Sequence, residues 1–217
     1  MLGHLAAQEK HPPDEDAFWE PAEPVAAELK VKRSLFVGHL APCKSEDDAR
    51  TFLERVRAEH RSATHNCWAY YLSDPETEYC SDDGEPSGTA GKPILSVIRQ
   101  SGLVNLMVVA TRYFGGVKLG VRGLIEAYGQ TAGLAVAQSK RVKRIRSRRL
   151  VISLPYDTIG DIIRLLEIYG TDVPAWKYGA HAEVSAEIRL SAVSQATVVL
   201  NELQARGLIF SWSWLLS

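Results

Sequence analysis

Cysteine is scarce in this sequence, and long apolar runs are missing from it. Cys43, Cys67 and Cys80 are odd in number and form no CxxC pair, so the sequence predicts neither a disulfide framework nor a cysteine-rich zinc site. No apolar run approaches the roughly 20 residues of a membrane-spanning helix. Residues 1–20 lack the basic start and apolar centre of a signal peptide. We therefore expect a cytoplasmic protein with no membrane partner.

Net charge is also small, −1 at pH 7, but the charges are unevenly distributed. Residues 1–139 hold 14 Lys and Arg against 19 Asp and Glu, and residues 150–217 hold 4 against 7. Between them, residues 140–149 hold 7 basic residues and no acidic residue. This stretch, the basic decapeptide, contains the whole basic excess of the chain.

The basic decapeptide allows two interpretations. Seven cations in ten residues can neutralise several phosphates and give salt-sensitive RNA binding. The alternative is a solvated linker that leads into a strand beginning near Leu150. The candidate nucleic-acid-binding residues are Lys140, Arg141, Lys143, Arg144, Arg146, Arg148 and Arg149.

Two polar, glycine-rich loops flank one apolar run in the middle of the chain. The first loop is CSDDGEPSGTAGKP at 80–93, the run is VNLMVVATRYF at 104–114, and the second loop is GGVKLGVRG at 115–123. The run predicts a buried strand, and loops of this kind can converge at a strand end to form a site. The candidate ligand-binding residues are Asp82, Asp83, Glu85, Ser87, Thr89, Lys92, Arg112, Tyr113, Gly115, Gly116 and Lys118.

The chemistry of these loops also allows two interpretations. Lysines and arginines beside glycines suit phosphate or carboxylate groups, and Tyr113 and Phe114 could stack on a base. Alternatively, the acidic side chains of the first loop pair with the cations of the second and fix the two loops to one another. In that case the two loops would have a structural role and no chemical one.

Several familiar sites are excluded by spacing. Gly91-Lys92 is not a phosphate loop, because Pro86 and Pro93 stand where that motif needs glycine and Ser or Thr. The glycines of the second loop do not form the dinucleotide-binding pattern GxGxxG. The acids at 82–85 could hold Mg²⁺ but lack a fixed ligand spacing. We therefore expect no cofactor and no metal.

His65 and Cys67 alternate on one predicted strand and raise the possibility of a nucleophile and its base. No third residue that would orient the histidine is evident. A packed or hydrogen-bonded histidine is the alternative. We assign no catalytic residue.

Three motifs carry a resemblance to a known family. The strings THNCWAY at 64–70, DDGEPSGTAGKP at 82–93 and TRYFGGVKLG at 111–120 resemble the IMPACT family, in particular its bacterial YigZ-type members with two domains. The resemblance covers nearly the whole chain. It implies an N-terminal domain with the α/β fold of the second domain of ribosomal protein S5, and a C-terminal domain similar to a ferredoxin-like domain of elongation factor G.

Hydrophobic periodicity predicts an α+β chain. The elements expected before residue 140 are a hairpin at 25–40, a helix capped by Ser45 and ending near His60, a strand at 64–72, a helix at 93–100, a strand at 105–113 and a helix at 119–139. Those expected after residue 149 are a strand at 150–154, a helix at 157–169, strands at 171–177 and 182–190, a helix at 192–205 and a strand at 208–215. This second set has the β-α-β-β-α-β order of the ferredoxin-like plait. The expected divisions are a loosely ordered start at 1–23, a domain at 24–139, the linker at 140–149 and a domain at 150–217.

The sequence leaves two hypotheses about function open. The first is a non-enzymatic binding protein that acts in translation or its regulation, through RNA, the ribosome or a translation-associated protein. It rests on the resemblance, which implies that eukaryotic IMPACT proteins regulate translation by competing for a partner of a stress kinase. The second is a hydrolase or transferase that acts on a phosphorylated or peptide-like small molecule in the two loops, 82–93 and 111–123.

Overall fold

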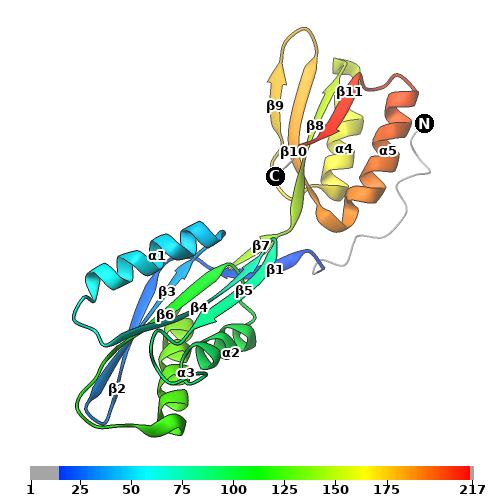
Figure 1. Ribbon diagram of the computed structural model, residues 1–217. Coiled ribbons are helices and arrows are strands. Elements are labelled where there is room, and N and C mark those ends of the chain that lie inside the picture. The colour runs from blue at the N-terminus through cyan, green and yellow to red at the C-terminus, as the bar shows by residue number, and fades with distance from the viewer. Residues whose placement is uncertain (1–14, 216–217) are drawn as a thin grey trace. The chain divides into compact units, whose positions relative to one another are not determined.

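The computed structural model describes residues 15–215, which form two compact units (Figure 1). The N unit is Trp19–Lys143, and the C unit comprises residues 15–18 and 144–215. Both boundaries fall inside strands, β1 (Ala17–Pro21) and β7 (Arg141–Ile145), which pair in a two-stranded sheet.

Two expected irregular segments are therefore partly strand. Residues 17–21 lie in β1, although a loosely ordered start was expected there, and residues 1–14 lie outside the described residues. Apart from Lys140 and Arg146, the basic decapeptide belongs to β7 and to the first residues of β8 (Ser147–Leu154). Strand pairing satisfies the backbone N–H and C=O groups of both segments, while most of the cationic side chains stay exposed.

The N unit contains a five-stranded antiparallel sheet in the order β2-β3-β6-β4-β5. The central strand is the predicted apolar run, and it is buried along nearly its whole length. It shows no polar alternation because helices cover both faces of the sheet. The strands are β2 (Val25–Val31), β3 (Ser34–Pro42), β4 (His65–Ser73), β5 (Glu76–Ser81) and β6 (Leu106–Tyr113).

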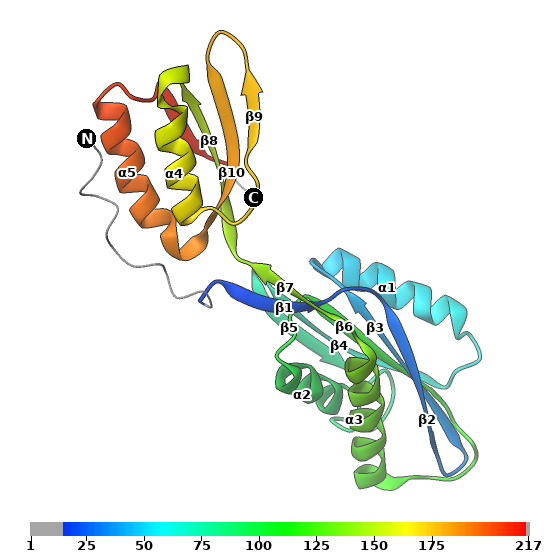
Figure 2. The same ribbon diagram turned by 180° about the vertical axis from the view of Figure 1, so that it is seen from behind.

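Three helices cover this sheet. Helix α1 (Glu46–Glu59) packs on one face, and α2 (Gly91–Ser101) and α3 (Gly120–Gln138) pack on the other (Figures 1 and 2). The predicted cap of α1 is confirmed, because Ser45 Oγ accepts the Asp48 N–H at 3.1 Å and the Asp48 carboxylate accepts the Ser45 N–H at 3.1 Å. This reciprocal pair satisfies two N–H groups at the start of the helix.

Strand β5 was not predicted from the sequence. It has only one neighbour, β4, and none of its six residues is buried. An edge strand of this kind carries charged and polar side chains that protect it from pairing with other chains. The segment has the composition of a loop because it contains Glu76, Thr77 and Glu78, and a strand was therefore not predicted there.

The C unit has the predicted β-α-β-β-α-β order around one core. Its four-stranded antiparallel sheet runs β11-β8-β10-β9, and the first strand begins at Ser147, three residues before the expected start. The remaining elements are α4 (Ile159–Tyr169), β9 (Ala175–Tyr178), β10 (Ala182–Arg189), α5 (Val193–Ala205) and β11 (Ser211–Trp214).

Residues from the start of the chain help to complete the C unit. The carboxylate of Asp16, which is buried, accepts the backbone N–H of Ser191 at 3.1 Å and also the Ser191 hydroxyl. The Asp16 carbonyl accepts the Arg146 N–H at 2.8 Å. The C unit is therefore built from both ends of the described chain.

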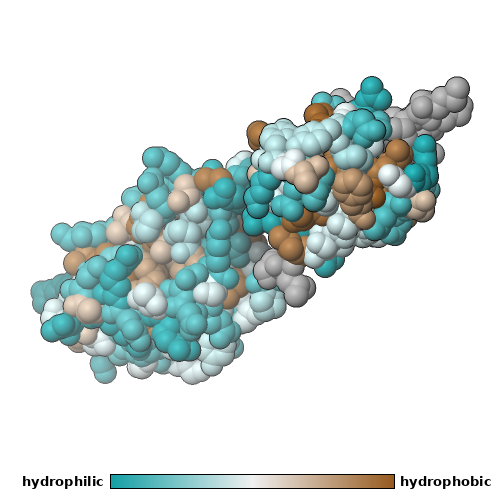
Figure 3. Space-filling view, turned by 90° about the horizontal axis from the view of Figure 1, so that it is seen from above, coloured by the Kyte–Doolittle hydropathy of each residue, from teal (hydrophilic) through white to brown (hydrophobic). Residues whose placement is uncertain are grey.

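Hydrophilic residues cover most of the face drawn in Figure 3, with small groups of hydrophobic residues between them. Within residues 15–215, no helix is both long enough and apolar enough to cross a membrane.

Gly38 on β3 marks the closest approach of α3 to the sheet. A Cβ at this position would lie 2.8 Å from the Thr131 carbonyl oxygen, and a backbone atom cannot swing aside. We expect Gly38→Ala to lower the free energy of unfolding by about 1–3 kcal/mol, measured by urea denaturation followed by circular dichroism. Gly129→Ala on α3 is the matched control, because its added methyl meets nothing within 4 Å and should stabilise the helix by up to about 1 kcal/mol. Equal losses in both variants would contradict the prediction.

Candidate functional site

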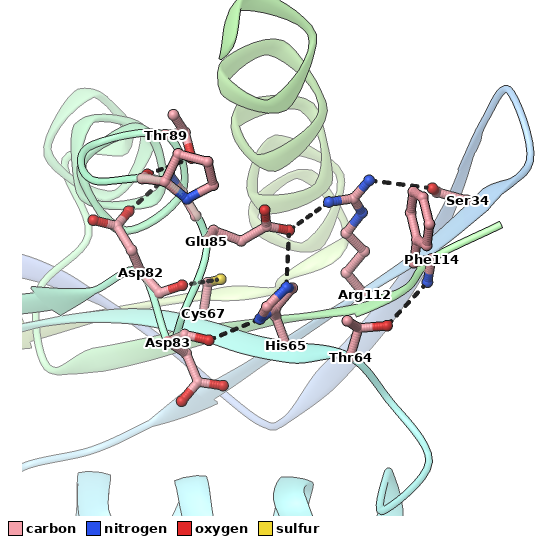
Figure 4. A network of polar contacts seen from close by, with 12 residues as sticks. Ser34, Thr64, His65, Cys67, Asp82, Asp83, Glu85, Thr89, Arg112 and Phe114 are labelled. Atoms are coloured by element: carbon pink, nitrogen blue, oxygen red, sulfur yellow. Dashed lines mark hydrogen bonds and ion pairs between the residues drawn. The ribbon is translucent and has the colours of Figure 1, made fainter. Parts of the chain in front are cut away.

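Asp82 holds the first loop in a fixed shape (Figure 4). Its carboxylate accepts the backbone N–H groups of Gly88 at 2.7 Å and of Ala90 and Gly91 at 2.9 Å each. Burial acts to raise the pKa of Asp82, but these three N–H groups outweigh burial and hold the pKa below its usual range. The Asp82 carboxylate therefore bonds to the backbone of its own loop and fixes the shape of that loop.

Glu85 joins the first loop to the sheet and to α3. One of its carboxylate oxygens accepts Arg112 Nη1 at 2.6 Å and the Tyr128 hydroxyl at 2.8 Å. Only 4% of the Glu85 side chain and 6% of the Arg112 side chain are exposed. A buried ion pair therefore fixes the first loop to the end of β6, next to the second loop, which resembles the alternative in which acids and cations hold the loops in place.

Asp83 attaches the same loop to β4 and α1. Its carboxylate forms an ion pair with Arg57 of α1 and accepts the Asn66 N–H at 2.7 Å. Its carbonyl oxygen lies 2.9 Å from His65 Nδ1. Asp83 itself has φ +43°, a conformation that few residues other than glycine and Asn or Asp adopt.

Cys67 and His65 serve as anchors for this loop. The Cys67 thiol is buried and donates to the Asp82 carbonyl at 2.9 Å. Burial raises the pKa of Cys67 to about 12, so the thiolate that a nucleophile needs is strongly disfavoured at neutral pH. His65 Nε2 lies 3.9 Å from the Glu85 carboxylate, beyond hydrogen-bonding distance. His65 and Cys67 therefore attach the first loop to β4.

The Arg112 guanidinium lies between two aromatic rings. Its Cζ atom is 5.5 Å from the Phe36 ring centre and 5.2 Å from the Phe114 ring centre, within the range of cation–π attraction. Besides the bond of Nη1 to Glu85, Nη2 lies 3.5 Å from Ser34 Oγ, and the buried Nε has no hydrogen-bond partner among residues 15–215. Arg112 is therefore well paired on one side only.

The second loop touches the turn between β2 and β3. A Cβ at Gly115 would lie 1.8 Å from the Arg33 carbonyl oxygen, so no larger residue fits at this position without moving the backbone. The Gly115 N–H points to Ser34 Oγ at 3.4 Å. This close approach gives Gly115, a predicted ligand-binding residue, a structural reason to be glycine.

The side chains of Tyr113 and Arg112 do not lie together. Successive side chains of a strand point to opposite faces of the sheet, and Tyr113 lies on the face covered by α1. Its hydroxyl is 2.7 Å from His60 Nδ1, and the His60 ring lies 4.7 Å from the His39 ring. A shared site that includes both Tyr113 and Arg112, as the sequence predicted, is not formed.

The other predicted ligand-binding residues differ in exposure. Thr89 is buried, and its hydroxyl donates to the Pro86 carbonyl at 2.7 Å. The exposed members of the set, which remain accessible to a ligand, are Ser87, Lys92, Gly116 and Lys118.

Sequence reasoning missed three residues that complete the network. Tyr128 reaches Glu85 from α3, Ser34 approaches Arg112 from β3, and Asn66 accepts the Thr111 hydroxyl at 2.8 Å. They lie 43, 78 and 45 residues from these partners along the chain. No local pattern in the sequence indicated them.

The cations of the basic decapeptide are exposed, except for the half-buried Arg148, and all but Lys140 and Arg146 lie on β7 or β8. Lys140 forms an ion pair with Glu23 at 3.0 Å, and Arg149 forms one with Glu187 at 2.9 Å. Exposed ion pairs contribute little stability, so these side chains can exchange their partners for phosphates.

No group of three or more His, Cys, Asp and Glu side chains within residues 15–215 is arranged to hold a metal ion.

Comparisons with known proteins agree with this geometry. Residues 32–136 match the family model described as the Impact N-terminal domain. The chain is 30% identical to an IMPACT family member from Haemophilus influenzae over 87% of this chain and 93% of the relative, and 37% identical to IMPACT family member YigZ from Escherichia coli over 67% and 73%. The chain belongs to the IMPACT family. The resemblance carried by the three motifs is thus confirmed.

Other members of the IMPACT family are similar over different lengths. IMPACT family member YvyE from Bacillus subtilis is 39% identical over 62% of this chain, which spans 63% of that relative, less than two thirds. A solved structure described only as a hypothetical protein is 31% identical, with a TM-score of 0.64 over 93% of this chain and 98% of that chain. The match to the Impact N-terminal domain contains both polar loops and ends before the basic decapeptide.

Removing the Glu85 carboxylate should destabilise the N unit strongly. Glu85→Ala leaves Arg112 buried without its only close acceptor among the described residues, and we expect a loss of about 3–5 kcal/mol in the free energy of unfolding, measured by urea denaturation. Glu78→Ala is the matched control, because it breaks the exposed Glu78–Arg99 pair and should cost less than about 1 kcal/mol. Similar small losses in both variants would show that the buried pair is not important for stability.

His39 should make the N unit sensitive to mild acid. Burial, together with the neighbouring His60 and despite the opposing Glu59, lowers the pKa of His39 to about 4 in the folded state. The unfolded chain takes up this proton near pH 6.5, so stability should fall as pH drops from 6.5 towards 4, by about 2–3 kcal/mol in total. His39→Gln should flatten this part of the stability profile, measured by urea denaturation at several pH values. An unchanged slope would refute the assignment.

Proposed function

We propose that this protein is a non-enzymatic binding protein that acts in translation or its regulation. The observation that carries the non-enzymatic part is the internal use of the first loop, since the side chains of Asp82, Glu85 and Cys67 all bond within the fold. Membership of the IMPACT family supports the translational part, because the resemblance to eukaryotic members implies translational regulation. The exposed lysines, arginines and glycines remain available to bind a partner.

RNA or the ribosome is the partner that the charge distribution favours. The basic decapeptide presents exposed cations, most of them on β7 and β8. Cations that neutralise phosphates release counterions, so binding of this kind weakens as salt increases. A translation-associated protein is the other partner in keeping with the family.

The alternative, a hydrolase or transferase in the two loops, needs a reactive group that is free to act. The raised pKa of Cys67 and the hydrogen bonds of the three loop acids count against it. A turnover that disappears when His65 alone is replaced would support it.

We also infer that the C unit is a ferredoxin-like domain and that the N unit is similar to the second domain of ribosomal protein S5. For the C unit, the support is a sheet in which the last, first, third and second strands lie side by side. For the N unit, it is the family resemblance. The free thiols of Cys43, Cys67 and Cys80 fit a reducing compartment such as the cytoplasm.

Ribosome co-sedimentation at several salt concentrations tests the proposed function. The triple variant Arg141→Gln, Arg144→Gln, Arg146→Gln should reduce the slope of log affinity against log salt by about 3, because each arginine that neutralises a phosphate adds about one to this slope. The matched control neutralises Arg50, Arg55 and Arg61, which are exposed on the N unit, and should leave the slope unchanged. Failure of the unaltered protein to bind ribosomes or RNA at low salt would refute the RNA-based proposal.

A further inference from the structure

The hydrogen bonds around Ser34 are unusually long for a buried site. Arg112 Nη2 lies 3.5 Å and the Gly115 N–H nitrogen 3.4 Å from Ser34 Oγ, whereas such bonds are typically about 2.9–3.0 Å. Arg112 Nε has no partner at all among the described residues. Arg112 Nη2 and the Gly115 N–H therefore share one hydroxyl oxygen, and Arg112 Nε is left without an acceptor. A buried donor without a good acceptor is costly, and an incoming anion would supply the missing acceptor atoms.

The side of Arg112 that faces Ser34 is separate from the side that binds Glu85. Figure 4 shows the guanidinium between the two, with Glu85 on one side and Ser34 and Phe114 on the other. The Glu85 oxygen that Arg112 contacts is also occupied by Tyr128. An anion could therefore bind beside Ser34 without displacing the carboxylate on which the fold depends.

Phe114 covers Arg112 on the solvent side. The Phe36 ring, which also contacts the guanidinium, is fully buried, whereas Phe114 is 46% exposed. The Phe114 N–H donates to Thr64 Oγ1 at 3.2 Å, which fixes the backbone below the ring. The exposed part of the Phe114 ring is available for stacking.

The exposed charges around this position are positive. The turn between β2 and β3 contributes Lys32 and Arg33, both exposed, and Arg33 packs directly against Gly115. Lys118 follows on the second loop and is also exposed. Gly116, with φ +83°, adds flexible backbone between them. These cations favour the approach of an anion along the loop.

We propose that this position, the Ser34–Arg112 site, binds one nucleotide of single-stranded RNA. The phosphate accepts hydrogen bonds from Arg112, Gly115 and Ser34, and the base stacks on Phe114. A donor cluster next to a half-exposed aromatic ring suits a nucleotide better than a carboxylate, because a base gains from stacking and a carboxylate does not. The inference rests on the proposed RNA function but uses residues outside the basic decapeptide.

Fluorescence anisotropy with a labelled single-stranded RNA, using the full chain, tests the site. Phe114→Leu should weaken binding about tenfold through the loss of stacking, and Ser34→Ala and Lys118→Gln should each weaken it several-fold. Phe210→Leu, which alters an exposed ring of the C unit, is the matched control and should have no effect. Urea denaturation of each variant separates lost binding from lost folding, and Arg112 is left intact because its replacement would unfold the N unit.

A second measurement does not depend on RNA. Titration with inorganic phosphate, followed by nuclear magnetic resonance, should shift the amide signals of Phe114, Gly115 and Gly116 but not that of Gly102. Absence of these shifts would overturn the site.

The two proposals fail in different ways. RNA binding that is unchanged in Phe114→Leu but lost in the Arg141, Arg144 and Arg146 triple variant would overturn the Ser34–Arg112 site and leave the proposed function standing. Competition by an acidic peptide but not by RNA would overturn the nucleotide assignment in favour of a protein partner. Additive losses in the two sets of variants would support both.

Discussion

The buried ion pair between Glu85 and Arg112 is the interaction on which the N unit depends. It connects the first polar loop, the central strand β6 and, through Tyr128, helix α3. Two charges removed from water are costly unless their geometry and further hydrogen bonds are good, and here Tyr128 and the flanking aromatic rings provide that support. The first glycine-rich loop is therefore part of the folded core and not a mobile connection.

This dependence divides the polar residues of the N unit into two groups. Asp82, Asp83 and Glu85 are committed to the fold, because Asp82 accepts N–H groups of its own loop and the other two accept hydrogen bonds from β4 and β6. The exposed cations at Arg33 and Lys118 have no such commitment to a buried partner within residues 15–215. This division is the structural basis of the proposed role in recognition.

Much of the fold followed from local patterns in the sequence. The cap at Ser45, the buried strand β6 and the element order of the C unit each depend on residues close together in the chain. Strand β5 did not follow, because an edge strand lacks a buried face. The site was harder to predict, because Tyr128 and Ser34 come from other elements, and because the alternation of β6 sends Tyr113 to the opposite face of the sheet from Arg112.

The bond between Asp16 and Ser191 has a consequence for how the chain is made. Synthesis proceeds from the N-terminus, and domains generally fold as units while the chain emerges. The N unit is continuous and can fold as soon as Lys143 has left the ribosome, whereas the C unit must wait until residues near its own end are translated. During that interval the Asp16 carboxylate is without the Ser191 donors, and residues that are made early are among the last to reach their final place.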